Sequence, residues 1–240
     1  MRLDTITTLT FDVVGTLIDF ETGIVEWYHP WLRRHRQRVD DEEILRAFAA
    51  AEDRLQRSNP EMPFTSMLPR IHDALAESWS LDSDESESLD FRDSIRDWPP
   101  FADAVAGLRT LRERFRLVAV TNADSWALEQ MSRTLGEPFD EVVTCDMVGV
   151  NKPDPRVWEF TLDRLGAKRE EILHCAQSTY HDLISARNFG LATAWIERRH
   201  DREGNGATPD TGETVKTDLH VHSLSELITA LEPRPPEEHP

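Results

Sequence analysis

Near its start the chain carries the run Leu9-Thr10-Phe11-Asp12-Val13-Val14-Gly15-Thr16-Leu17, on which the interpretation of the whole fold depends. An apolar, β-branched run that ends in an ionisable side chain is typical of a buried strand whose end opens to a ligand pocket. Gly15 allows a sharp turn, so that neighbouring backbone amides can face a ligand. The same pattern also fits an aspartate that merely forms a turn, so the other strand ends must decide between the two interpretations.

Similar short runs recur along the chain and predict six strands, at residues 9–14, 117–121, 141–145, 172–176, 193–197 and 219–222. Amphipathic helical stretches separate most of them, and parallel strands need such crossover connections. We therefore expect an α/β fold with a Rossmann-like, mainly parallel sheet that is covered on both faces. Ligands of such sheets bind outside the carboxyl ends of the strands.

About a hundred residues separate the first two strands, whereas a crossover needs only about a dozen. This stretch predicts four helices, at residues 24–36, 41–55, 64–79 and 85–95, with breaks at Pro60, Pro63 and Pro99. We expect a helical cap (18–97) inserted into a catalytic core (1–17 and 98–232), with a frayed tail (233–240). The aromatic side chains Trp27, Trp31 and Phe64 are expected to form the core of this cap, and Trp98 to mark the hinge.

The composition excludes several classes of partner. A net charge of −18 repels nucleic-acid phosphates and anionic membrane surfaces, so neither is an expected partner. No run approaches the roughly 18 apolar residues of a membrane span, and the start of the chain lacks a signal-peptide pattern, which predicts a cytoplasmic location. The acidic, lysine-poor composition fits either a salt-adapted surface or a GC-rich genome.

The two cysteines, Cys145 and Cys175, lie in apolar strand-like runs without metal-ligand spacing, which predicts reduced core thiols.

Polar side chains follow the other strands. Thr121 and Asn122 close the second strand, and their short side chains suit an oxyanion or a carboxylate. Lys152, one of only three lysines, follows the third strand, where Asn151-Lys152-Pro153 is expected to begin a helix. An ammonium close to Asp12 would keep that carboxylate ionised and reactive. After the fourth strand comes Gln177-Ser178-Thr179-Tyr180-His181-Asp182, and then a helix that ends at Gly190.

These groups, in this order and with an insertion after the first strand, resemble the haloacid dehalogenase superfamily over about residues 9–200 outside the cap. The resemblance implies the following roles: Asp12 as nucleophile, Thr16 as its supporting hydroxyl, Thr121 and Asn122 as the second motif, Lys152 as the third and Asp182 as the fourth.

Two positions differ from the phosphatases that make up most of that superfamily. Those enzymes carry a proton-donating aspartate two positions after the nucleophile, where this chain has Val14. They also bind Mg²⁺ through an aspartate at the position of Gln177. The resemblance therefore implies metal-free attack on carbon, with no cofactor and no metal ligands, and Mg²⁺ is expected only if the chain is a phosphatase after all.

Within the superfamily the chain is similar to the (S)-2-haloacid dehalogenases. It is also similar to the azetidine-2-carboxylate hydrolases, in segments such as 22–25, 172–174, 180–182 and 194–196. Both classes act on a small carboxylate with a leaving group on its α-carbon.

The implied mechanism is displacement by Asp12 to give an ester, which is then hydrolysed by a water that Asp182, Ser178 or Lys152 orients. Val14, Thr121, Asn122 and Tyr180 would contact the substrate, and Thr121, Asn122 and backbone amides would hold its carboxylate.

Several alternatives remain open at this stage. The first hypothesis is a 2-haloacid dehalogenase, although the cap stretch in which those enzymes carry a halide-binding arginine reads Phe-Ala-Ala-Ala-Glu at 48–52. Ring opening of a strained cyclic imino acid, a Mg²⁺-dependent phosphatase and a non-catalytic ligand-binding protein are the others. Residues 200–215 are interpreted as a surface connection rather than as a loop that covers the site. The sequence leaves open whether the protein forms a homodimer.

Overall fold

The computed structural model describes residues 3–202, 204, 206–208 and 215–232. The predicted tail (233–240) lies outside the described residues. A short 3-10 helix, η1 (Leu3–Thr5), leads into the first strand. Among the described helices, none is both long enough and apolar enough to cross a membrane.

The core is a six-stranded sheet in which every strand pairs in parallel with its neighbour, as expected for a Rossmann-like fold. The strands are β1 (Thr8–Phe11), β2 (Arg116–Thr121), β3 (Glu141–Thr144), β4 (Ile172–Ala176), β5 (Ala192–Ile196) and β6 (Leu219–Val221), in the order β3-β2-β1-β4-β5-β6. Strand order reverses beside β1, and ligands of open α/β sheets bind at such a reversal. Asp12, the residue after β1, therefore lies at the expected place for a site.

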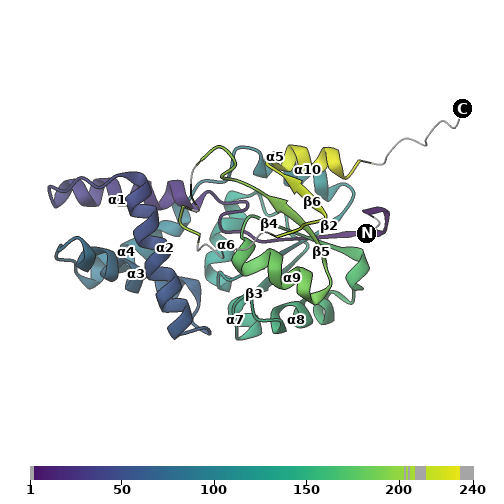
Figure 1. Cartoon of the computed structure of the whole chain (residues 1–240), viewed down its shortest axis with the longest axis horizontal. Helices are drawn as coiled ribbons and strands as arrows, with labels where there is room; N and C mark the ends of the chain where they lie inside the picture. Colours follow the sequence, from purple (N-terminus) through teal and green to yellow (C-terminus); the bar gives the residue numbers. More distant parts are fainter. Residues whose placement is uncertain (1–2, 203, 205, 209–214, 233–240) are drawn as a thin grey trace, which may run out of the picture.

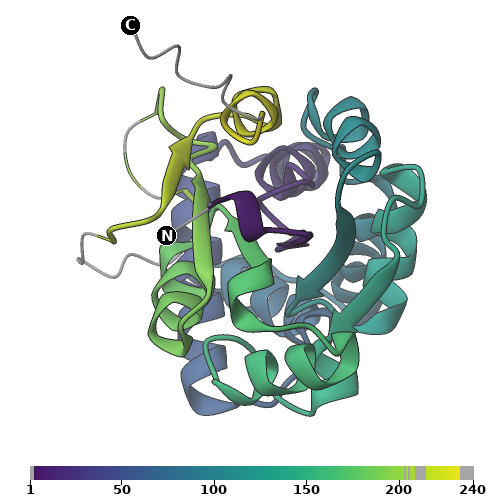
Figure 2. The same ribbon diagram turned by 90° about the vertical axis from the view of Figure 1, so that its right-hand side faces the viewer.

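Helices cover both faces of this sheet (Figure 1 and Figure 2). They are α5 (Ala104–Arg112), α6 (Ser125–Thr134), α7 (Cys145–Val148), α8 (Arg156–Leu165), α9 (Ile184–Phe189) and α10 (Leu224–Ala230), with short 3-10 turns such as η3 (Arg169–Glu171) between elements. One face packs Val118, Val120 and Ile172 against Trp158 of α8. The cysteines are buried as predicted, although Cys145 begins α7 instead of ending β3.

The stretch between β1 and β2 forms four helices and a short 3-10 turn, here called the helical lobe (residues 20–97). Its elements are α1 (Phe20–Arg34), α2 (Asp41–Ser58), α3 (Phe64–Ser78), α4 (Glu85–Asp93) and η2 (Ser94–Asp97). The first helix begins four residues earlier than expected because Asp19 caps it, accepting a hydrogen bond from the backbone N–H of Thr22. Trp31, Phe48 and Phe91 are fully buried and form the centre of the lobe.

The six-stranded sheet and the helices that cover it are here called the sheet domain. The chain leaves and re-enters it along two adjacent backbone segments. The N–H of Asp19 donates to the carbonyl of Pro99 (2.8 Å), and the N–H of Phe101 donates to that of Leu17 (2.9 Å). Trp98 packs at this junction against Gly23 of α1, where any Cβ atom would collide with the indole ring. The helical lobe thus lies beside the carboxyl end of β1 (Figure 1), and a division into domains at 17/18 and 97/98 remains a prediction.

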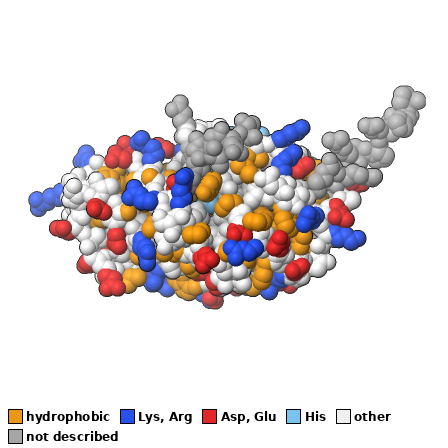
Figure 3. All heavy atoms as spheres, turned by 60° about the horizontal axis from the view of Figure 1, so that its bottom comes forward, with side chains coloured by type: hydrophobic (Ala, Val, Ile, Leu, Met, Phe, Trp, Pro, Cys, Tyr) orange, Lys and Arg blue, Asp and Glu red, His pale blue; other side chains and the backbone are white. Residues whose placement is uncertain are grey.

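Charged side chains of both signs are scattered among apolar ones over the face shown in Figure 3. This surface is mixed although the whole chain is strongly acidic.

Candidate active site

A cavity lies between the carboxyl ends of the central strands and the helical lobe. Among the described residues it is lined from three sources: Asp12, Val14, Thr121, Asn122, Ala123, Lys152, Ser178, His181 and Asp182 from the sheet domain, Phe20, Glu52 and Phe64 from the helical lobe, and Ala207 and Thr208 from the segment after β5. Most of the predicted site residues therefore meet at one place. Phe64, expected to be plain core, forms part of the wall.

Asp12 is held by the turn that follows β1. The hydroxyl of Thr16 donates to Oδ2 of Asp12 (2.8 Å) and accepts a hydrogen bond from the N–H of Gln177 (2.9 Å). The turn needs the left-handed backbone of Gly15, whose φ is 84°. Thr16 thus occupies the supporting position that the sequence predicted for it.

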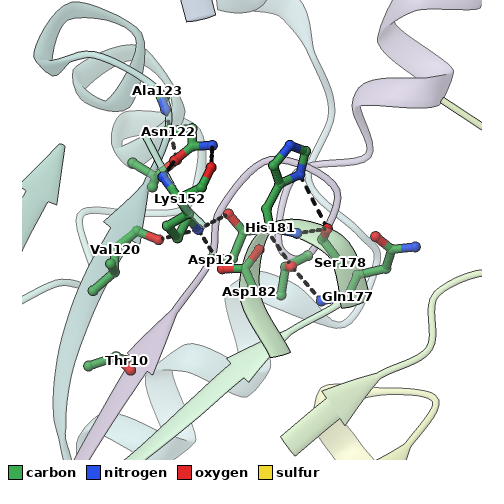
Figure 4. A network of polar contacts seen from close by, with 12 residues as sticks. Thr10, Asp12, Val120, Asn122, Ala123, Lys152, Gln177, Ser178, His181 and Asp182 are labelled. Atoms are coloured by element: carbon green, nitrogen blue, oxygen red, sulfur yellow. Dashed lines mark hydrogen bonds and ion pairs between the residues drawn. The ribbon is translucent and has the colours of Figure 1, made fainter. Parts of the chain in front are cut away.

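Lys152 lies between two carboxylates and is 1% exposed. Its Nζ donates to Oδ1 of Asp12 (2.9 Å), to Oδ1 of Asp182 (2.5 Å) and to the carbonyl of Val120 (2.8 Å). All three ammonium protons therefore have acceptors (Figure 4). The prediction that Lys152 begins a helix is wrong. Lys152 lies in the loop between α7 and α8, and α8 begins only at Arg156.

Asn122 holds this loop in place. Its Oδ1 accepts from the N–H of Lys152 (2.7 Å), and its Nδ2 donates to the carbonyl of the same residue (3.0 Å). The side chain predicted to contact substrate thus clamps the lysine backbone in the structure. Thr121 lines the cavity beside it, and its hydroxyl accepts from the N–H of Ala123 (3.1 Å).

Asp182 is supported from behind by a residue that the sequence reasoning did not assign to the site. Nε2 of His174 lies 2.9 Å from Oδ1 of Asp182, and its Nδ1 lies 2.9 Å from the hydroxyl of Thr10. Both His174 and Thr10 are fully buried in adjacent strands. A histidine inside an otherwise apolar strand was the available signal, because a buried polar ring needs partners.

The charges of the three buried groups are coupled. Burial raises the pKa of Asp12, and Lys152 offsets part of that rise. Burial would also raise the pKa of Asp182, but Lys152 and His174 outweigh it and lower that pKa to about 2. Burial lowers the pKa of Lys152, whereas the two carboxylates raise it to above its ordinary value. The lysine therefore stays charged and lowers the pKa of Asp12 relative to burial alone, although that pKa remains above its ordinary value.

Ser178 and His181 form the wall beside Asp182. His181 lies on the π-helical turn η4 (Thr179–Leu183), and Ser178 caps the start of that turn. The hydroxyl of Ser178 accepts from the N–H of His181 (3.0 Å). Burial lowers the pKa of His181 to about 4, so its ring is neutral near pH 7. Of the two neighbours that the sequence could not separate, His181 lines the cavity, whereas Tyr180 packs against its ring and is not among the lining residues.

Glu52 is the unexpected member of the site. It projects from α2 into the cavity and is 8% exposed. Burial, with a smaller contribution from Asp53, raises its pKa to about 8, so the carboxyl group is largely protonated at pH 7. It belongs to the stretch 48–52, for which the resemblance implies a halide-binding arginine. Lys152 is the only lysine or arginine among the described residues that line this cavity.

The segment after β5 is part of the wall, which contradicts its interpretation as a mere surface connection. Glu21 of α1 accepts from the N–H of Ala207 (2.9 Å) and pairs with Arg199. Arg199 also contacts Glu42 of α2. Gly206 makes this approach possible, since a Cβ atom there would collide with Glu21 and Arg199. Ala207 and its neighbour Thr208 are thereby fixed over the cavity.

The site offers few ligands for a hard cation. Asp12 and Asp182 are the two carboxylates near the end of β1, and Val14 and Gln177 supply none. Lys152 contacts both carboxylates, and the second oxygen of Asp12 accepts from Thr16. Mg²⁺ prefers several oxygen ligands in octahedral geometry, so these residues fit it poorly.

Comparison with known proteins gives a family. Residues 6–190 match the family model of the haloacid dehalogenase-like hydrolases. The (S)-2-haloacid dehalogenase of Pseudomonas sp. strain YL is 34% identical over 46% of this chain and 49% of its own length. Pyrimidine 5'-nucleotidase YjjG of Escherichia coli is 31% identical over 54% of this chain and 56% of its own. These two alignments span about half the length of either relative. (S)-2-haloacid dehalogenase 1 of Pseudomonas sp. strain CBS-3 is 24% identical over 94% of this chain and 96% of its own.

The folds of solved structures superpose on nearly the whole chain. The L-2-haloacid dehalogenase PA0810 superposes with a TM-score of 0.77 at 25% identity, covering 94% of this chain and 98% of its own. The L-2-haloacid dehalogenase of Xanthobacter autotrophicus gives 0.78 at 20% identity over 94% and 98%, a similarity that concerns the fold alone.

Proposed function

Because this chain belongs to the haloacid dehalogenase-like hydrolases, we propose that Asp12 attacks the α-carbon of a small carboxylate and that the chain converts (S)-2-haloacids to 2-hydroxy acids. One observation carries the proposal. The cavity around Asp12 contains Val14 where phosphoryl transfer would need a second carboxylate, so an apolar side chain faces the reacting atoms. The dehalogenases among the relatives and solved structures support the same substrate class.

The first step is displacement at carbon. A carboxylate oxygen of Asp12 forms a bond to the α-carbon as the carbon–halogen bond breaks, and the halide leaves with the electron pair. Lys152 and Thr16 position the carboxylate by hydrogen bonds to its two oxygens. The hydroxyl groups of Thr121 and Ser178, together with nearby backbone amides, are the donors proposed to bind the substrate carboxylate.

The second step is hydrolysis of the ester. Water attacks Cγ of Asp12 and the bond between Cγ and the substrate oxygen breaks. One proton of the water passes to the departing hydroxy acid, and the other is released to solvent, which leaves Asp12 as a carboxylate. One oxygen atom of the water stays in Asp12. Asp182 and Ser178 both face the cavity beside Asp12 and are proposed to orient this water, while Lys152 keeps the carboxylate in place.

The test uses (S)-2-chloropropionate and enzyme in excess, in water enriched in ¹⁸O. A single turnover should release chloride without added metal and leave the label in the peptide that contains Asp12. Asp12→Asn should release no chloride while keeping the far-UV circular dichroism of the parent.

Label found only in the product would instead indicate direct attack by water on carbon. Phosphate release from a generic ester that a chelator abolishes, without chloride release, would replace the proposal by a phosphatase. Ligand binding that survives in Asp12→Asn without turnover by the parent would indicate a binding protein.

Glu52 supports a second candidate, cleavage of a strained carbon–nitrogen bond in a cyclic imino acid such as azetidine-2-carboxylate. A halide leaves without a proton, whereas a ring nitrogen bound as the neutral amine must gain a bond to hydrogen as it leaves. A buried, protonated carboxyl group in the cavity of Asp12 can supply that proton. In this reaction Asp12 bonds to carbon, the electron pair of the C–N bond goes to nitrogen, and nitrogen takes the proton of Glu52. Hydrolysis of the ester then returns a proton from water to Glu52.

Glu52→Gln distinguishes the two candidates, because an amide cannot donate a proton of useful acidity. If the substrate loses an amine, this substitution should lower kcat by about 100-fold or more, because a general acid usually contributes about 10²–10⁴-fold. If it loses a halide, chloride release should change little. Glu43→Gln, an exposed position on the same helix, is the matched control. If Glu52→Gln lowers the rates of ring opening and of chloride release equally, Glu52 contributes to the shape of the cavity and does not act as a proton donor.

A further inference from the structure

Two histidines and a glutamate meet at the outer edge of the sheet, away from the cavity of Asp12. Glu197 is the residue after β5, and His220 and His222 lie in and just after β6. The two strands pair in parallel, with Ile196 opposite Val221. Side chains two residues apart on a strand point to the same side, so His220 and His222 both face Glu197. None of the three lines the catalytic cavity.

The donor atoms of these side chains are already close together. Nε2 of His220 lies 2.7 Å and Nε2 of His222 lies 3.6 Å from the same carboxylate oxygen, Oε2 of Glu197. One possible ligand atom from each residue lies within 4.8 Å of the other two. Neighbouring ligands of a tetrahedral Zn²⁺ ion, with bonds of about 2.0–2.2 Å, are about 3.4 Å apart. Small side-chain rotations that move the donor atoms by a few tenths of an ångström to about one ångström would therefore allow all three to bind one ion.

Neighbouring groups fix the orientation of both imidazole rings. The ring of His220 stacks on Trp195 with centroids 4.3 Å apart, and that of His222 stacks on His200 at the same distance. Nδ1 of His222 lies 3.8 Å from Oε2 of Glu226, which also accepts from the N–H of His222 (2.9 Å). At 3.8 Å this contact is an electrostatic one and not a hydrogen bond, but a carboxylate on the side of Nδ1 favours a proton there and leaves Nε2 free to coordinate.

We propose that Glu197, His220 and His222 bind one transition-metal cation, with Zn²⁺ as the preferred ion. Two imidazoles and one carboxylate suit Zn²⁺ better than Mg²⁺ or Ca²⁺, which prefer oxygen ligands. The partial exposure of these residues leaves a fourth position for water. The strongly acidic chain also attracts cations.

The ion would act on structure. It joins the end of β5 to the three-residue edge strand β6, the shortest strand of the sheet. The segment that connects these two strands includes Ala207 and Thr208 of the catalytic cavity. The ion would therefore link the residue at the start of that segment, Glu197, to the histidines that follow its end. The inference does not depend on which bond Asp12 attacks.

The test is calorimetric titration of ZnCl₂ into the chelator-treated full chain at pH 7.5. We expect about one Zn²⁺ per chain with micromolar or tighter affinity, and about tenfold weaker binding or worse in His220→Gln and in His222→Gln. His29→Gln is the matched control, because His29 also pairs with one exposed carboxylate, that of Asp41, at 2.8 Å. At one fixed Zn²⁺ concentration the ion should also raise the melting temperature of the parent and of His29→Gln more than that of the two site variants.

Two outcomes would overturn the proposal. One is the absence of binding by the folded parent at micromolar Zn²⁺, as judged by both heat and melting temperature. The other is equal Zn²⁺ affinity in the parent, His220→Gln and His222→Gln, which would place the ion elsewhere. Substitution with Co²⁺ provides a second readout, since tetrahedral coordination by the two imidazoles should give visible absorption that both variants lose.

Discussion

Oε1 of Gln56, in the helical lobe, lies 2.8 Å from Nε2 of His181, in the sheet domain. The helical lobe is therefore joined directly to the π-helical turn η4 at the wall of the cavity. A second connection comes from Asn151, whose Nδ2 donates to the carbonyls of Pro60 and Met62 at 2.9 Å each. Because the loop of Asn151 also carries Lys152, the position of the helical lobe and that of the lysine are mechanically coupled.

His181 should make the protein sensitive to mild acid. Burial lowers its pKa from 6.5 to about 4, so the unfolded chain binds a proton before the folded one does. The stability that neutral His181 contributes is present above pH 6.5 and is lost as the pH falls through 4. Between pH 7 and pH 5 the loss is about 2 kcal/mol. Urea unfolding at both pH values should show a smaller loss in His181→Gln. An identical loss in both proteins would assign the acid sensitivity to other groups.

Lys152→Met should destabilise the fold strongly at neutral pH. The substitution leaves the buried carboxylates of Asp12 and Asp182 without their shared cation. Breaking such a buried ion pair on one side costs about 3–5 kcal/mol. Urea unfolding at pH 7 measures the effect, with exposed Lys168→Met as the control. A loss below about 1 kcal/mol, the range of a surface ion pair, would contradict the burial of this lysine.

Glu52→Gln should change how stability depends on alkaline pH. Burial raises the pKa of Glu52 from 4.5 to about 8, so its contribution to stability is fully present below pH 4.5 and is lost as the pH rises through 8. The parent should lose at most about 4 kcal/mol from this group between pH 4.5 and pH 8.5. Glu52→Gln does not titrate and should lose less over the same range, whereas the exposed variant Glu43→Gln should follow the parent. Parallel stability profiles of Glu52→Gln and the parent would count against a protonated Glu52.

Glu21→Gln should weaken substrate binding more than turnover. The neutral side chain loses its charge pairing with Arg199, which helps to hold Ala207 and Thr208 over the cavity. A rise in KM of about tenfold, equivalent to about 1.4 kcal/mol, with kcat changed less than about threefold, is the expected result. Glu26→Gln, exposed on the same helix, serves as control. An unchanged KM would show that this contact does not shape the binding surface.

The sequence alone determined the class of fold and the four groups at its centre. Six β-branched runs and one long insertion are local patterns, and they correctly predicted the parallel sheet and the four helices of the lobe. Asp12 and Lys152 could be found because the carboxyl ends of parallel strands meet at one edge of a sheet, whereas Thr16 and Asp182 were assigned from the resemblance to a known family. Any polar residue that follows such a strand closely is thereby brought near the others.

Tertiary structure decided which surrounding side chains face the cavity. The sequence did not indicate that α2 points Glu52 and Gln56 at the site, because the rotation of a helix about its axis depends on how the whole lobe packs. It could not choose between Tyr180 and His181, since a π-helical turn sets their directions. Nor could it reveal that Asn122 holds the backbone of Lys152 across thirty positions of the chain. The position of a strand end can be predicted from the local pattern of apolar and polar residues. The contacts of these side chains, by contrast, arise from packing between segments far apart in the chain.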